Sequence, residues 1–114
     1  MLVYEDLNEE QRSFISNGCG PKGSFKVPDL LFKDACDVHD FYYWRGNTEE
    51  WRLKGDKVML FIMRHNANKA VWWKRPFYHT MALVYFWQVR HKGWAFFNYE
   101  KEKTMDDLHR EMGV

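Results

Sequence analysis

Four residues with reactive or metal-binding side chains lie close together in the sequence, at intervals of three and four: Cys36, His39, Asp40 and Tyr43. On a helix, this spacing makes Cys36 a neighbour of both His39 and Asp40. A neutral imidazole accepts a proton from a reacting water, and a carboxylate is a ligand for a hard cation. The stretch therefore indicates general-base chemistry beside a metal ion. An adjacent His-Asp pair is also common as an ordinary surface or core pair, so the interpretation needs supporting residues.

A loop rich in glycine and proline precedes this stretch. It contains Gly18, Gly20, Pro21, Gly23 and Pro28. Such a density of glycine and proline disfavours regular structure and favours an exposed backbone. Calcium takes roughly six to eight oxygen ligands, and loop carbonyls can provide several of them. The sequence thus predicts a calcium site made by the loop together with Asp40.

The loop and the helix together resemble the secreted phospholipase A2 superfamily. Its signature is a Cys-Gly calcium loop followed by a helix that bears Cys-x-x-His-Asp-x-x-Tyr. The present chain has Asn17-Gly-Cys-Gly-Pro-Lys-Gly23 and then Asp34-Ala-Cys-Asp-Val-His-Asp-Phe-Tyr-Tyr43. The helix motif is most similar to the small bacterial and fungal branch, which is mostly helical and has few disulfides, whereas the loop is more like that of animal members. The resemblance covers residues 17–63.

The resemblance implies calcium-dependent hydrolysis of the sn-2 ester of glycerophospholipids at a membrane surface. Four oxygen ligands for Ca²⁺ follow from it: the carbonyls of Gly18, Gly20 and either Lys22 or Gly23, and the carboxylate of Asp40. The third carbonyl departs in spacing from the family's Gly-x-Gly loop. His39 is then the base that activates water, while calcium polarises the ester carbonyl and neutralises the developing oxyanion.

A carboxylate is needed at the second nitrogen of the imidazolium that forms on His39, and Asp56 is predicted to supply it. His39 lies seven residues before Gly46, and Asp56 lies ten after it. At about 1.5 Å per residue, both are roughly 10–14 Å from the turn, so antiparallel packing of the two helices brings them level. Glu49 and Glu50 are too near the turn. The alternative for Asp56 is an ordinary exposed acid.

The same resemblance assigns partners to Tyr43 and to the two cysteines. Tyr43 would hydrogen-bond Asp56, although a plain core tyrosine is the equal alternative. Cys19 and Cys36 would form a disulfide that ties the loop to the catalytic helix. In an arbitrary small protein, two reduced thiols would be the first expectation.

The helical patterns predict an all-α fold class, and the resemblance implies a small phospholipase A2-like fold with two antiparallel catalytic helices and a calcium loop. At 114 residues, one domain is expected over 1–114, with a motif-bearing core at 17–63 and a helical and aromatic extension at 67–114. Helices are expected over 5–15, from Pro28-Asp29 to Gly46, from a cap at Asn47 toward Asn66, over about 76–91, and from Thr104 onward. The segment 94–99 is either irregular or a strand.

An anchor to lipid is predicted at Trp72, Trp73, Lys74 and Arg75, because tryptophan favours the headgroup zone and cations favour anionic lipid. The alternative is aromatic packing between helices followed by a solvated pair of charges. Residues 77–89 are nearly unbroken in apolar character and are expected to be core, while Trp94 fits either environment. With 17 basic and 16 acidic residues, no net field recruits nucleic acid or an anionic membrane, so any electrostatic steering must come from local patches.

Two other functional classes share these motifs. One is a catalytically silent module, or a toxin-like member, that binds calcium or lipid. The other is a phage or viral accessory domain that breaches a membrane. Residues 1–16 carry five charged side chains, and no apolar stretch is long enough for a membrane span. Export by a signal peptide is thus not supported, whereas the resemblance implies a protein that is secreted, or delivered outside its cell by another route or in a virion; a monomer is preferred.

Overall fold

A computed structural model describes residues 1–16 and 29–113 of the chain. In these ranges it contains helices and no strand, which confirms the predicted all-α class. The elements are the 3₁₀ helix η1 (Tyr4–Asp6), α1 (Glu9–Ile15), α2 (Asp29–Arg45), α3 (Glu49–Ala67), α4 (Arg75–Lys92), the 3₁₀ helix η2 (Gly93–Ala95) and α5 (Met105–Met112). None of these helices is long and apolar enough to cross a membrane.

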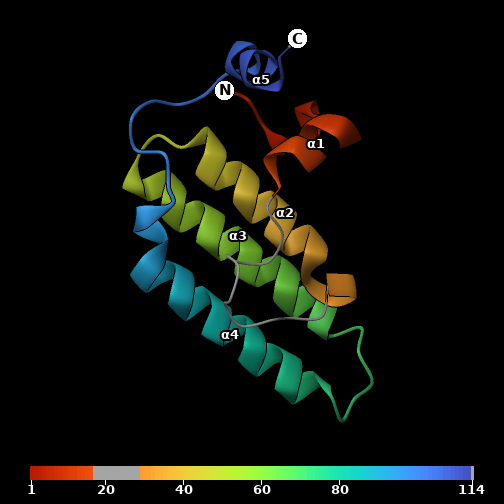
Figure 1. Cartoon of the computed structure of the whole chain (residues 1–114). Helices are drawn as coiled ribbons and strands as arrows, with labels where there is room; N and C mark the ends of the chain where they lie inside the picture. Colours follow the sequence, from red (N-terminus) through yellow and green to blue (C-terminus); the bar gives the residue numbers. More distant parts are fainter. Residues whose placement is uncertain (17–28, 114) are drawn as a thin grey trace.

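The three long helices α2, α3 and α4 lie side by side, each running opposite to the one before it (Figure 1). Their shared core contains three residues of α2 (Phe32, Ala35, Cys36), two of α3 (Met59, Met63) and three of α4 (Met81, Ala82, Tyr85). Flexible methionine side chains fill the irregular space between the helices. Helix α4, from the extension at 67–114, thus packs into the same core as the motif-bearing helices.

A three-residue turn between α2 and α3 holds these two helices in antiparallel contact. Gly46 has φ +72°, and an added Cβ would lie 2.0 Å from the carbonyl oxygen of Asn98, so only glycine fits. The predicted cap at Asn47 is wrong, because Asn47 lies in the turn with φ 117°. Thr48 is the residue that precedes the first turn of α3.

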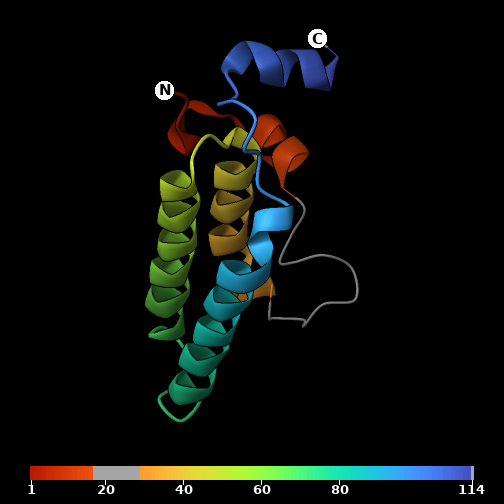
Figure 2. The ribbon, with the colours of Figure 1, turned by 90° about the vertical axis from the view of Figure 1, so that its left-hand side faces the viewer.

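Short helices at both ends of the chain pack over the turn end of α2 (Figure 2). Their cluster contains Leu7, Ile15, Phe41 and Leu108. The continuous helix predicted for 5–15 is interrupted, since the Asn8 side chain accepts a hydrogen bond from the Gln11 amide and starts α1 afresh. Thr104 caps α5 as predicted. The segment 94–99 begins in η2 and forms no strand.

Helix α4 departs from the expectation that residues 77–89 are core. Met81, Ala82 and Tyr85 are buried, but Phe77, Leu83, Val84 and Trp87 are exposed. The apolar character of α4 therefore extends around the helix, while only one side of it faces α2 and α3. A one-dimensional hydropathy pattern cannot distinguish these two apolar sides.

Candidate functional site

The carboxylate of Asp56 is the centre of the candidate site. It lies on α3 and is 0% exposed. Its Oδ1 atom is 2.7 Å from Nε2 of His39 on α2, and His39 is itself 8% exposed. The predicted contact across the two antiparallel helices is therefore present, and the alternative of an ordinary exposed acid is wrong for Asp56.

Tyr43 lies one turn beyond His39 on α2 and contacts the same carboxylate. Its hydroxyl donates a 2.7 Å hydrogen bond to Oδ1 of Asp56, and its ring lies 4.1 Å from the His39 ring, centre to centre. Burial, followed by the bond to Asp56, raises the pKa of Tyr43 well above its usual value. The hydroxyl therefore keeps its proton and remains a donor. Gly93 makes room for this group, because an added Cβ would lie 2.4 Å from the hydroxyl.

The second oxygen of Asp56 is held from α4. Nη1 of Arg90 donates a 2.6 Å hydrogen bond to Oδ2 of Asp56. Arg52, one turn before Asp56 on α3, has Nη1 3.8 Å from the same oxygen and donates a 2.8 Å bond to the carbonyl of Val89. Two positive charges thus compensate a buried carboxylate, as burial of a charge requires.

Glu49 joins the two arginines into a network. It accepts 2.7 Å hydrogen bonds from Nε of Arg52 and Nη2 of Arg90, and a 2.6 Å bond from the Tyr99 hydroxyl. The hydrogen bond from Arg52 is the chief reason that the pKa of Glu49 is lowered to about 2. Although Glu49 was too near the turn to reach His39, it orients the arginines that hold Asp56.

Arg52, Arg90 and Tyr99 were not among the residues singled out from the sequence. The Arg52-to-Asp56 spacing of four residues is the signal for a helical ion pair, so Arg52 was within reach of sequence reasoning. Arg90 lies 34 residues from Asp56, and no local pattern connects them.

Asp40, the predicted side-chain ligand, lies on α2 with oxygen-bearing neighbours. The Ser16 hydroxyl is 3.5 Å from Oδ2 of Asp40 and donates a 2.5 Å bond to Oδ1 of Asp37. Asp37, to which no role was assigned, also pairs with Lys33 at 2.8 Å. A set of carboxylate and hydroxyl oxygens suits a hard cation such as calcium. Among residues 1–16 and 29–113, no three His, Cys, Asp or Glu side chains form a metal-binding group.

The remaining predicted loop residues, Gly18, Cys19, Gly20, Lys22 and Gly23, lie outside the described residues. Cys36 is buried in the core on α2 and is not a free thiol. Its pairing with Cys19 stays a prediction, as do the loop carbonyl ligands.

The predicted lipid anchor lies in the connection between α3 and α4 and at the start of α4. Trp72 and Trp73 are 76% and 63% exposed, so they do not pack between helices as the alternative required. Nζ of Lys74 lies 4.9 Å from the centre of the Trp73 ring, and Nε of Arg75 donates to the carbonyl of Ala70.

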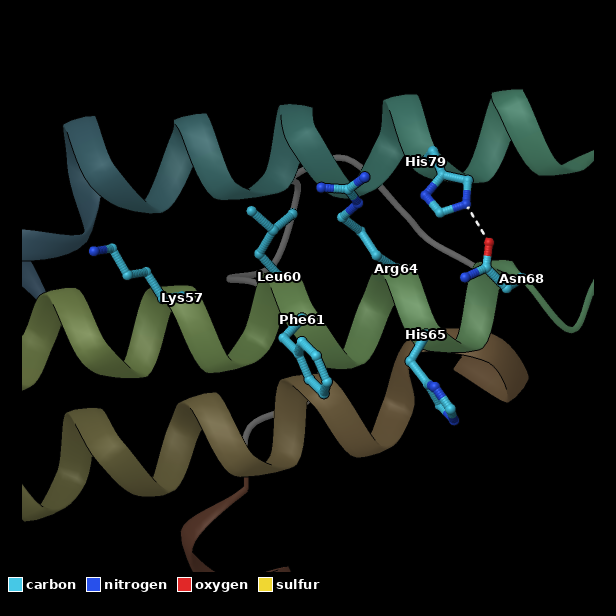
Figure 3. A pocket seen from close by; sticks show the side chains of 7 residues that line it. All are labelled: Lys57, Leu60, Phe61, Arg64, His65, Asn68 and His79. Carbon is cyan, nitrogen blue, oxygen red and sulfur yellow. Dashed lines mark hydrogen bonds between the residues drawn. The ribbon is translucent and has the colours of Figure 1, made fainter.

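A separate depression of about 590 Å³ opens between α3 and α4 (Figure 3). It is lined by Lys57, Leu60, Phe61, Arg64, His65, Asn68 and His79. Nε2 of His79 lies 2.8 Å from the Asn68 side-chain oxygen. None of the side chains that contact the Asp56 carboxylate lines this depression, so it is distinct from the site of His39.

Comparison with known proteins found no match: no family model, no curated protein and no solved structure is similar to this chain.

Proposed function

We propose that this protein is a calcium-dependent phospholipase A2 that hydrolyses the sn-2 ester of glycerophospholipids. The observation that carries the proposal is the contact of His39 and Tyr43 with one buried carboxylate, Asp56. This arrangement joins the residues of the resemblance across two helices. It favours an active enzyme over a catalytically silent relative, because a silent module needs no buried carboxylate on its histidine.

The geometry defines the role of each nitrogen of His39. An ionised carboxylate accepts hydrogen bonds and donates none, so Nε2 of the neutral imidazole carries the proton and donates it to Asp56. The lone pair on Nδ1 is then available to take a proton from water. As water attacks the ester carbonyl, its proton moves to Nδ1, and the positive charge that develops on the ring is stabilised by Asp56. The ester C–O bond then breaks, and Nδ1 returns the proton to the departing glycerol oxygen, which releases the fatty acid and the lysophospholipid.

Tyr43 and Arg90 are positioning residues in this scheme. They bind the two oxygens of Asp56, which prevents the carboxylate from rotating away from His39. The fixed carboxylate keeps the imidazole in one orientation and in one tautomer.

Calcium fits the proposal through the oxygen atoms around Asp40. The carboxylate of Asp40 would hold the ion together with loop carbonyls predicted at Gly18, Gly20 and Lys22 or Gly23. When bound, the ion would polarise the ester carbonyl and offset the negative charge on its oxygen. The exported location and the Cys19–Cys36 disulfide belong to the same proposal.

The experiment is release of fatty acid from phosphatidylglycerol or phosphatidylethanolamine vesicles, with identification of the position that is cleaved. Release from the sn-2 position should be abolished by a calcium chelator and by His39→Ala. The matched control is His109→Ala, an exposed histidine on α5, which should retain full activity. Hydrolysis that survives the chelator or His39→Ala would exclude the mechanism. Calcium binding without hydrolysis would instead identify the silent class.

A further inference from the structure

The charges of the chain are strongly segregated, although they nearly cancel in total. Between Lys57 and Tyr99 there is no aspartate or glutamate. The same segment contains Lys57, Arg64, Lys69, Lys74, Arg75, Arg90 and Lys92. It comprises the later part of α3, all of α4 and η2. One part of the fold is therefore basic, and the acidic residues belong to the rest of the chain.

Helix α4 carries a second apolar side within this basic segment. Its inner side packs into the core, whereas Phe77, Leu83, Val84 and Trp87 lie exposed on its outer side. Phe77 is 61% exposed and Trp87 is 57% exposed. Together with Thr80, the exposed residues recur at helical spacing along one side, and none of them is charged. A helix that is apolar on both sides is stable when both sides are covered.

Exposed aromatic side chains also flank both ends of α4 in the sequence. Trp72 and Trp73 are exposed before its first residue, and Trp94 and Phe96 are exposed after its last. Eighteen residues of helix at about 1.5 Å each give a length of roughly 27 Å. Figure 1 shows α4 at one edge of the three-helix layer, with α3 beside it. The exposed apolar residues of α4 itself share one side of the helix, which we call the α4 strip: Phe77, Leu83, Val84 and Trp87.

The chemistry of the α4 strip suits an anionic lipid surface. Tryptophan favours the zone between headgroups and acyl chains, and lysine and arginine beside an apolar side are attracted to anionic headgroups. Lys74 and Arg75 lie at one end of the strip, and Lys92 lies at the other. Lys57 and Arg64, which line the depression between α3 and α4, add charge of the same sign. A second copy of the chain is a poorer partner, because a symmetric contact would bring two acid-free basic segments together.

We propose that the α4 strip docks on the surface of an anionic phospholipid bilayer, with α4 lying along the membrane plane. Phe77, Val84 and Trp87 enter the boundary of the acyl chains, and the flanking cations bind the headgroups. The inference rests on the proposed function for its purpose, since docking would hold the enzyme at the surface that contains its substrate. The attraction to the membrane itself requires neither calcium nor turnover.

The test uses the full chain with vesicles that it cannot hydrolyse. Ether-linked phosphatidylglycerol lacks the sn-2 ester, and ether-linked phosphatidylcholine is its zwitterionic counterpart. In the presence of a chelator, the chain should co-sediment with the first and about tenfold less with the second. The double variant Phe77→Ala, Trp87→Ala should bind the anionic vesicles about tenfold or more weakly, since large apolar side chains are no longer buried in lipid. Phe14→Ala, an exposed phenylalanine on α1, should bind as the unchanged chain does.

The possible outcomes separate this proposal from the enzymatic one. Equal binding by the double variant and the unchanged chain overturns docking by the α4 strip, as does equal binding to the two lipids. A dimer in the absence of vesicles that the double variant loses would assign the strip to a second copy. If docking fails while dispersed short-chain phospholipid is still cleaved, the enzymatic proposal stands alone. If docking holds and ester-linked lipid is never cleaved, only the enzymatic proposal falls.

Discussion

Arg90 on α4 donates a 2.6 Å hydrogen bond to Oδ2 of Asp56, the carboxylate whose Oδ1 lies 2.7 Å from Nε2 of His39. One buried group thus links three helices, and each of its oxygens has a partner from a different helix. Helix α4, which holds Asp56 through Arg90, also carries the exposed α4 strip. A change at Asp56 or Arg90 should therefore affect both activity and stability.

Asp56→Asn should lower turnover by about 10²-fold or more, because an amide cannot stabilise the imidazolium or define its tautomer as a carboxylate does. Calcium affinity should change little, since Asp40 is the proposed side-chain ligand. The measurements are the rate of fatty-acid release and calorimetric titration with calcium. Loss of calcium binding in a folded variant would assign Asp56 to the metal site instead.

Arg90→Met should lower the free energy of unfolding by about 2–3 kcal/mol, because it removes a charged hydrogen bond from a carboxylate that stays buried. Urea unfolding followed by circular dichroism measures this loss. Arg90→Lys should lose less, since a lysine keeps the charge but not both contacts with Asp56 and Glu49. Unchanged stability in both variants would contradict the role of Arg90 as the main counter-charge.

Tyr43→Phe should cost about 1–2 kcal/mol of stability and reduce turnover only severalfold, because Asp56 keeps its contacts with His39 and Arg90. A chemical denaturation curve together with the vesicle assay checks both effects. A loss of activity as complete as that of His39→Ala would show that Tyr43 acts on the substrate directly.

Glu49→Gln should make the stability of the folded chain depend less on pH in the acid range. The pKa of Glu49 is lowered from 4.5 to about 2 when the chain folds, chiefly by the hydrogen bond from Arg52. A lowered pKa contributes stability that is present above pH 4.5 and is lost as the pH falls toward 2. Thermal unfolding measured across this pH window should therefore show a smaller decrease in the variant than in the unchanged chain. Glu50→Gln, at the adjacent position, should follow the unchanged chain.

Reduction should destabilise the protein if Cys19 and Cys36 are bonded, by about 3 kcal/mol for a loop of this length. Mass spectrometry without a reductant should find the chain two hydrogens lighter than its sequence mass. A full-mass chain that reacts with a thiol reagent after denaturation would show two thiols.

Local pattern was enough to predict the long helices and the level placement of His39 and Asp56. Helical spacing and a short connection constrain neighbouring helices strongly, so these features follow from the order of the residues. The start of α1 could also have been found, because Asn8 and Gln11 stand at the spacing of a capping box. The interruption before α1 shows that a polar side chain can override an apolar periodicity.

Only the tertiary structure decided which side of α4 faces the core and that Arg90 reaches Asp56. Apolar residues surround α4, so the order of residues alone does not indicate which of them meet α2 and α3. Packing selected Met81, Ala82 and Tyr85 for the core and left Phe77 and Trp87 exposed. The same rotation of α4 directs Arg90 toward the buried carboxylate, because burial of Asp56 requires a counter-charge wherever the chain can bring one.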